Sequence, residues 1–105
     1  MAHPSKAKGN RFERLVVNIT KDEGIPAKRA YGSNGQALGC HEEVDVLIND
    51  TIKVQCKTRK RIANWMIPSE HVDIQLIKED RGIPYVVLSY DDYLELIKKV
   101  NKIKS

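Results

Sequence analysis

Three polar residues, Asp45, Gln55 and Lys57, interrupt an otherwise apolar stretch, EVDVLINDTIKVQCK, at residues 43–57. The Asp45 carboxylate, the Gln55 amide oxygen and a nearby main-chain carbonyl are oxygen donors of the kind that Mg²⁺ binds. A bound metal ion would activate water and offset charge on a scissile phosphate. The Lys57 ammonium would position that water or stabilise the developing negative charge. These residue types therefore predict metal-assisted phosphodiester cleavage, provided that the three side chains lie together.

The register of a β-hairpin decides whether they do. Val and Ile favour strands, and the pair Asn49-Asp50 favours a turn. A two-residue loop would point Asp45 away from Gln55, whereas a three-residue loop over 49–51 brings them opposite each other. Only the second register separates polar from apolar side chains, so we predict it. The predicted apolar face consists of Val44, Val46, Ile48, Ile52, Val54 and Cys56. The predicted polar face consists of Asp45, Leu47, Lys53, Gln55 and Lys57.

The hydrophobic pattern of the rest of the chain predicts the elements that position this hairpin. Apolar residues recur at helical spacing from Lys8 until Gly24, and again between Ser69, a candidate N-cap, and Gly82. The expected elements are a helix over 8–23, a strand over 25–31, the two hairpin strands, a helix over 69–81, a buried strand over 85–88 and a helix over 91–99. This αβββαβα order is typical of an α/β fold. The connection 32–42, GSNGQALGCHE, is long and glycine-rich, which is typical of a functional or mobile loop.

Length and composition limit the class of protein. At 105 residues the chain is expected to form a single domain over 1–105, with 1–7 as a flexible tail. Its 18 Lys and Arg against 14 Asp and Glu give a net charge of +4, which fits a polyanionic partner. The apolar runs are too short for a membrane span or a signal peptide, and no small-molecule cofactor is expected. Two cysteines are too few for a disulfide framework, which favours an intracellular, cytoplasmic location; for a virus-encoded protein this would be the host cell.

Four segments carry a resemblance to a known family: KGNRFER at 8–14, RAYGSNG at 29–35, EVD at 43–45 and QCKTRK at 55–60. Together with the expected element order, they resemble the PD-(D/E)XK nuclease superfamily, and within it the small archaeal and phage Holliday junction resolvases. The resemblance covers roughly residues 8–100. It implies a restriction-endonuclease-like core in which helices flank a mixed central sheet. It also implies a homodimer that makes paired, Mg²⁺-dependent nicks across a four-way DNA junction, with Mn²⁺ as a substitute metal.

The same resemblance assigns roles to five residues. By position, Asp45 is the metal-binding aspartate, Gln55 is the second metal ligand and Lys57 is the catalytic lysine. Glu13 matches a glutamate of the first helix that completes the metal site. Ser33 matches a loop serine near the scissile phosphate. The resemblance therefore implies a site drawn from the first helix, the glycine-rich loop and the hairpin.

Basic residues near these positions are expected to bind DNA. Charge runs are usually solvated faces, but here they flank the expected site in the sequence. The expected DNA-binding residues are Lys8, Arg11, Arg14, Arg29, Arg59, Lys60 and Arg61. Contacts to the phosphate backbone would position DNA without reading its sequence, and binding should weaken steeply with salt.

One position departs from the family pattern. Asp or Glu is common where this chain has Gln55, and a neutral amide binds Mg²⁺ more weakly than a carboxylate does. Gln at this place also occurs in the Mrr-type restriction endonucleases. Two alternatives therefore stay open: an Mrr-like or repair-type DNA endonuclease, and a catalytically inactive DNA-binding module of the same fold. Mg²⁺-dependent turnover distinguishes the module from the enzymes, and preference for a four-way junction distinguishes the two enzymes.

Three further residues have competing interpretations. Cys56, on the predicted apolar face, is expected to be an inert buried thiol. His41 is a candidate general base, although a loop residue at the strand entrance is the more economical interpretation. Trp65 would wedge into a junction or anchor the core or a dimer, and the second helix with Trp65 is the predicted dimer surface.

Overall fold

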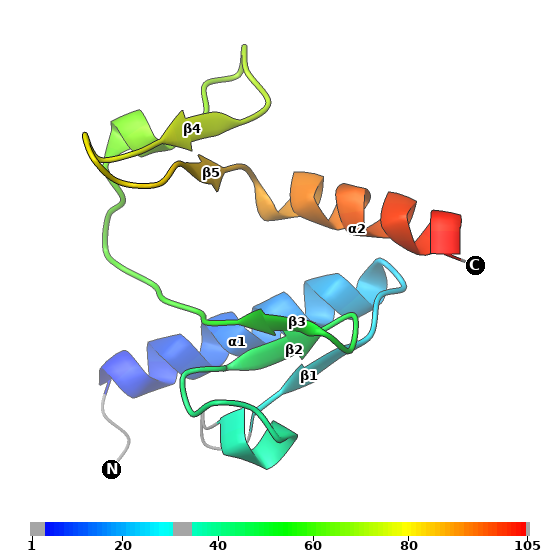
Figure 1. Cartoon of the computed structure of the whole chain (residues 1–105). Coiled ribbons are helices and arrows are strands. Elements are labelled where there is room, and N and C mark those ends of the chain that lie inside the picture. Colours follow the sequence, from blue (N-terminus) through cyan, green and yellow to red (C-terminus); the bar gives the residue numbers. More distant parts are fainter. Residues whose placement is uncertain (1–3, 31–34, 105) are drawn as a thin grey trace. The chain divides into compact units, whose positions relative to one another are not determined.

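A computed structural model describes residues 4–30 and 35–104 of the chain. It divides into two compact units, Met1–Thr58 and Arg59–Ser105, which are described separately (Figure 1). Each unit combines helix with antiparallel sheet, so the predicted α/β class is confirmed. No helix in these described ranges is long and apolar enough to cross a membrane.

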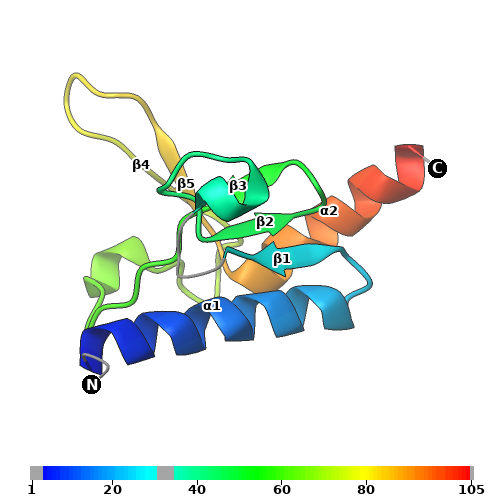
Figure 2. The same ribbon diagram turned by 90° about the horizontal axis from the view of Figure 1, so that it is seen from below.

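The first unit packs one long helix against a three-stranded antiparallel sheet. Its elements are α1 (Pro4–Asp22), β1 (Ala27–Arg29), the 3₁₀ helix η2 (Gly35–Leu38), β2 (Val46–Ile48) and β3 (Ile52–Val54). The strand order is β1-β2-β3, and α1 contacts β1 and β2. Figures 1 and 2 show α1 lying along one face of this sheet. The strand β2, which directly follows Asp45, therefore has a partner strand on each side.

One stripe of α1 closes the core of this unit. Glu13, Val16, Val17 and Thr20 are buried and follow the i, i+3, i+4, i+7 spacing of a single helix face. The buried residues from the strands and their flanking segments are Ile25, Ala27, Ala30, Val44, Val46 and Ile48. The Thr20 hydroxyl donates a 2.6 Å hydrogen bond to the Val16 carbonyl, which satisfies it within the helix. Glu13 is thus the charged residue that this apolar core must accommodate.

The predicted hairpin register is confirmed. The pairs are Val46 with Val54, Leu47 with Lys53 and Ile48 with Ile52, which leaves a loop of three residues. Asn49 and Asp50 adopt left-handed φ values of 52° and 64°, conformations that Asn and Asp tolerate better than most residues. Burial alternates as predicted: in β2, Val46 and Ile48 are buried and Leu47 is half-buried. In β3, Ile52 and Val54 are half-buried and Lys53 is exposed.

A single glycine fixes the loop that leads into β2. The Gly35 carbonyl accepts a 2.9 Å hydrogen bond from the Cys40 N–H. A Cβ on Gly35 would overlap the carbonyl oxygen of His41 and lie 2.9 Å from the Cβ of Val44. Only glycine fits this approach, so the segment just before Asp45 is closely packed where the structure describes it.

The second unit contains η3 (Asn64–Met66), β4 (Gln75–Ile77), β5 (Tyr85–Val87) and α2 (Tyr90–Lys104), with β4 antiparallel to β5. The last predicted helix is confirmed and extends five residues further than expected. Its N-cap is Ser89, whose hydroxyl accepts a 3.2 Å hydrogen bond from the Asp92 N–H. Asp91 and Asp92 in the first turn, with Lys102 and Lys104 in the last, match the helix dipole.

The helix predicted over 69–81 is wrong. The structure has strand β4 there, and the Ser69 hydroxyl accepts a hydrogen bond from the His71 N–H in a turn instead of capping a helix. Val72, Ile74 and Leu76 alternate with polar residues, a period of two that also satisfies part of a helical pattern. The αβββαβα order is therefore not observed in the described residues. The implied mixed sheet is not observed either, since both described sheets are antiparallel.

Two smaller expectations are also corrected. Helix α1 begins at Pro4, so part of the segment expected to be a tail is helical, with proline in the first turn, where its missing N–H has no cost. The strand over 85–88 exists as β5 but is not buried, because Tyr85 and Val86 are 62% and 52% exposed. An apolar run predicted the strand correctly and its burial incorrectly.

Candidate functional site

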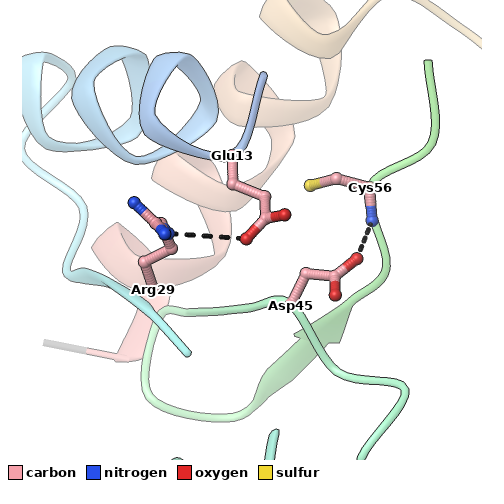
Figure 3. Close-up of polar contacts among 4 residues, drawn as sticks. All are labelled: Glu13, Arg29, Asp45 and Cys56. Carbon is pink, nitrogen blue, oxygen red and sulfur yellow. Dashed lines mark hydrogen bonds and ion pairs between the residues drawn. The ribbon is translucent and has the colours of Figure 1, made fainter. Parts of the chain in front are cut away.

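Asp45 is held by main-chain bonds on both sides. Its N–H donates to the Val54 carbonyl and its carbonyl accepts from the Ala30 N–H, both at 2.8 Å. Its side chain is fixed as well, because Oδ2 accepts a 2.8 Å hydrogen bond from the Cys56 N–H (Figure 3). The second oxygen, Oδ1, has no hydrogen-bond partner in the described part of the chain. One carboxylate oxygen is therefore anchored, and the other remains available to a ligand.

Glu13 projects from the buried stripe of α1, and its side chain is only 5% exposed. Its Oε1 lies 3.5 Å from Nε of Arg29, the last residue of β1. The two residues form an ion pair without a well-directed hydrogen bond, since the buried Nε has no hydrogen-bond partner. A buried carboxylate needs a compensating charge, and Arg29 supplies one.

The Glu13 and Asp45 carboxylates both lie close enough to the Cys56 thiol to affect its pKa. The pKa of this thiol is raised to about 11, mainly by burial and also by the negative charges of Asp45 and Glu13. Figure 3 shows both carboxylates and the sulfur gathered between α1 and the hairpin. The thiol is protonated at neutral pH and a poor nucleophile, as predicted, although Cys56 is half-buried and not buried.

Gln55 and Lys57 are exposed and lie beyond the end of β3 at Val54. The prediction that Gln55 pairs directly with Asp45 is wrong, because regular pairing stops one residue earlier. Asp45 instead bonds to Val54 and, through its side chain, to the main chain of Cys56. Gln55 and Lys57 flank Cys56 in the sequence, so their main chain borders the cluster while their side chains point to solvent. Ser33 lies outside the described residues.

The predicted DNA-binding residues occupy different places. Lys8, Arg11 and Arg14 are exposed on α1. At 3.6 residues per turn they lie roughly 140°, 160° and 100° around the helix from Glu13, so closeness in sequence does not bring them to its buried side. Residues 59–61 are exposed. Arg29, another of the expected basic residues, contacts the candidate site through Glu13.

Sequence reasoning missed two contacts of this site. The first is the Arg29–Glu13 ion pair, which depends on the contact between α1 and β1. The second is the Cys56 N–H that holds Asp45. A prediction of the β1–β2 register would have placed Arg29 beside Asp45, but three-residue strands carry too little pattern to fix a register.

The donors present suit a hard metal ion. Mg²⁺ and Mn²⁺ prefer oxygen ligands, and Asp45 and Glu13 provide two carboxylates to the cluster. Over the described ranges, no group of three His, Cys, Asp or Glu residues is arranged to hold a metal. The third predicted ligand is the Gln55 amide, which is exposed next to the cluster. The ligand types fit the metal, and two of the three are gathered.

The family model described as archaeal Holliday junction resolvase (Hjc) matches residues 4–104, nearly the whole chain and both units. The chain belongs to this family. Hjc members are endonucleases that resolve Holliday junctions hydrolytically, in DNA recombination and repair. The resemblance predicted from the four sequence segments is therefore confirmed, and so is the assignment as a nuclease. No curated protein and no solved structure matches the chain.

Membership of the Hjc family indicates what the cluster of Glu13, Asp45 and Cys56 could bind. The family acts on branched DNA and generally uses a divalent metal ion. The Glu13 and Asp45 carboxylates are the described oxygen donors that match this use. The assignment also favours a resolvase over the Mrr-like alternative, since the match covers the segments of the predicted site.

Proposed function

We propose that this chain is a Mg²⁺-dependent endonuclease that resolves four-way DNA junctions by paired nicks. The observation that carries the proposal is the gathering of Glu13 and Asp45 around Cys56, directly beside Gln55 and Lys57 in the chain. Two buried or half-buried carboxylates close to each other are unfavourable without cations, since like charges repel. Arg29 compensates the charge of Glu13, and a bound metal ion would compensate the charge that is left.

Each residue has a role in this proposal. Asp45, Glu13 and the Gln55 amide oxygen would hold Mg²⁺, and Mn²⁺ would substitute. The bound ion would supply activation of water and neutralisation of phosphate charge. Lys57 orients the attacking water or stabilises the charge that develops on the phosphate. Ser33 is retained as a residue near the scissile phosphate on the resemblance alone.

DNA binding is assigned to the exposed basic residues. Lys8, Arg11 and Arg14 offer contacts along the outer side of α1, and residues 59–61 offer contacts just after Lys57. Both groups suit phosphates better than bases, so the selectivity would be for branched structure. Binding should weaken steeply as salt rises.

We further propose that the two units work as one nuclease domain and that two copies form a homodimer. The family match across both units supports a single nuclease domain. The homodimer is supported by large exposed apolar side chains on Arg59–Ser105, because such patches usually mark an interface. Trp65, Leu76 and Ile83 are 65%, 66% and 65% exposed and line a hollow of about 700 Å³. A two-fold axis would set two sites against opposed strands of a junction.

One observation favours a second candidate, a DNA-binding module without catalysis. Gln55 is neutral where a third carboxylate is common, and its side chain is exposed. Such a module would bind junctions tightly and release no product with any divalent ion.

The deciding experiment compares a synthetic four-way junction with the matching linear duplex, in Mg²⁺, for the native protein and Lys57→Ala. Lys53→Ala is the matched control, an exposed lysine of β3. We expect paired nicks in the junction alone, lost in Lys57→Ala and kept in Lys53→Ala. Cleavage of both substrates would indicate a broader nuclease, and tight junction binding without cleavage would indicate the module.

A further inference from the structure

We propose that Arg29 is a positioning residue that replaces the metal ion at Glu13 in the metal-free protein and moves to a DNA phosphate when the metal binds. The inference rests on the proposed function, because it assigns Glu13 to the metal site. It adds that metal binding and DNA binding strengthen each other because both depend on the position of Arg29.

The burial of Glu13 requires a cation at this place at all times. Its side chain is 5% exposed, and an ionised carboxylate so removed from water is strongly unfavourable without a partner of opposite charge. Arg29 provides that partner from the end of β1, at 3.5 Å. If Glu13 is to bind Mg²⁺, the ion and the guanidinium compete for the same carboxylate.

The geometry of the Arg29–Glu13 ion pair is that of a weak contact, which a metal ion could replace. Arginine binds a carboxylate most strongly through two parallel hydrogen bonds from its planar fork. Here Arg29 approaches with Nε, which is buried and makes no hydrogen bond. Figure 3 shows a terminal guanidinium nitrogen pointing away from Glu13. The Arg29 side chain is 25% exposed, so its fork is within reach of a ligand from solvent.

Charge balance gives the coupling its direction. Glu13, Asp45 and Arg29 together leave one uncompensated negative charge. A bound dication would turn this into one uncompensated positive charge and repel the adjacent guanidinium. One phosphate of the DNA backbone restores the balance, and a guanidinium fork suits phosphate oxygens well. Metal binding should therefore strengthen DNA binding, and by reciprocity DNA should strengthen metal binding.

The test measures Mn²⁺ affinity without DNA, by electron paramagnetic resonance, for the native protein, Arg29→Gln and Lys28→Gln. Lys28 is the matched control, an exposed neighbour on β1 that loses the same charge. Removal of the competitor should make Arg29→Gln bind Mn²⁺ roughly tenfold more tightly, within the usual range of such couplings. Lys28→Gln should change the affinity less than twofold, and Arg29→Lys should restore a near-native value. Unchanged or weaker Mn²⁺ binding by Arg29→Gln overturns the proposal.

A second measurement guards against a variant that fails to fold. In a Lys57→Ala background, which prevents cleavage, we measure junction binding with and without Mn²⁺. Mn²⁺ should strengthen junction binding several-fold, and Arg29→Gln should remove this effect. Glu13→Gln should release Arg29 and strengthen metal-free junction binding. If Glu13→Gln leaves metal-free junction binding unchanged, Arg29 does not move from Glu13 to DNA and the proposal is overturned.

These outcomes separate the two proposals. Failure of the native protein to bind Mn²⁺, or Mn²⁺ binding that survives Asp45→Asn unchanged, would overturn the metal site and with it the proposed function. Native Mn²⁺ binding that depends on Asp45 but is indifferent to Arg29 would overturn the inference about Arg29 alone.

Discussion

The Cys56 main chain and the Asp45 side chain are joined by a 2.8 Å hydrogen bond from N–H to Oδ2. The bond ties the segment that follows β3 to the residue that precedes β2. It also fixes the orientation of the Asp45 carboxylate and leaves Oδ1 without a hydrogen bond in the described part of the chain. A carboxylate held in this way is prepared for a ligand before any ligand arrives.

Asp45→Asn should separate the structural role of this carboxylate from its chemical role. The amide oxygen of Asn can accept the same hydrogen bond, so we expect the melting temperature to stay within a few degrees of the native value. The lost charge should reduce Mg²⁺-dependent junction cleavage by at least about a hundredfold. Asp50→Asn, in the exposed hairpin turn, is the control and should cleave normally. Loss of junction binding along with cleavage would mean that Asp45 is structural only.

Gln55→Glu should preserve or raise activity. The change adds a third carboxylate beside Asp45 and Glu13, and carboxylates bind Mg²⁺ more strongly than amides. The measurement is the Mg²⁺ concentration that gives half-maximal cleavage, which should fall. Gln36→Glu in η2 adds the same charge elsewhere and should leave that concentration unchanged. A completely inactive Gln55→Glu protein would show that the amide has a role of its own.

Two glycines should respond oppositely to alanine. Gly9 is helical, and a Cβ there would lie 4.0 Å from Oε2 of Glu13, an ordinary contact. Gly9→Ala should therefore stabilise the fold by about 1 kcal/mol through helix propensity and keep cleavage intact. Gly24 ends α1 with a φ of 77°, so Gly24→Ala should destabilise the fold by about 1 kcal/mol. Urea unfolding measures both, and a destabilised Gly9→Ala protein would indicate closer packing against Glu13 than the contact shows.

The raised pKa of Cys56 predicts a loss of stability at high pH. The folded thiol has a pKa of about 11 against 9.0 for an unperturbed one, so the unfolded state ionises first as pH rises. Stability from this group is fully present below pH 9 and is lost as pH rises from 9 to 11. Cys56→Ala should show a smaller fall in unfolding free energy over that range than the native protein, and Cys40→Ala should not. Equal falls in both variants would contradict the assignment.

The sequence predicts some parts of this molecule better than others, for physical reasons. The hairpin register follows from one requirement, the sorting of polar from apolar side chains, and only one loop length meets it. Helix α1 follows from the apolar residues that recur at helical spacing from Lys8 until Gly24. The segment 69–81 misleads because Val72, Ile74 and Leu76 fit a strand as well as a helix, and only pairing with β5 decides between them.

The sequence likewise predicts some contacts of the candidate site and not others. Residue types and motif positions predicted Glu13 and Asp45 as partners, and the structure brings them to one cluster. The pairing of Asp45 with Gln55 failed because regular pairing ends at Val54. The role of Arg29 at Glu13 depends on a contact between α1 and β1, which no pattern within either segment encodes.

The two-sided anchoring of Asp45 in the sheet has a consequence for the energetics of binding. Its main chain and one carboxylate oxygen are already ordered, so they lose little freedom when a ligand arrives. Gln55 and Lys57, exposed beyond the last strand, still hold most of their rotamer entropy, which for such long side chains is up to about 1.5–2 kcal/mol each. The site is thus rigid on one side and adaptable on the other. The affinity for a branched substrate will depend on how much of that remaining freedom the substrate removes.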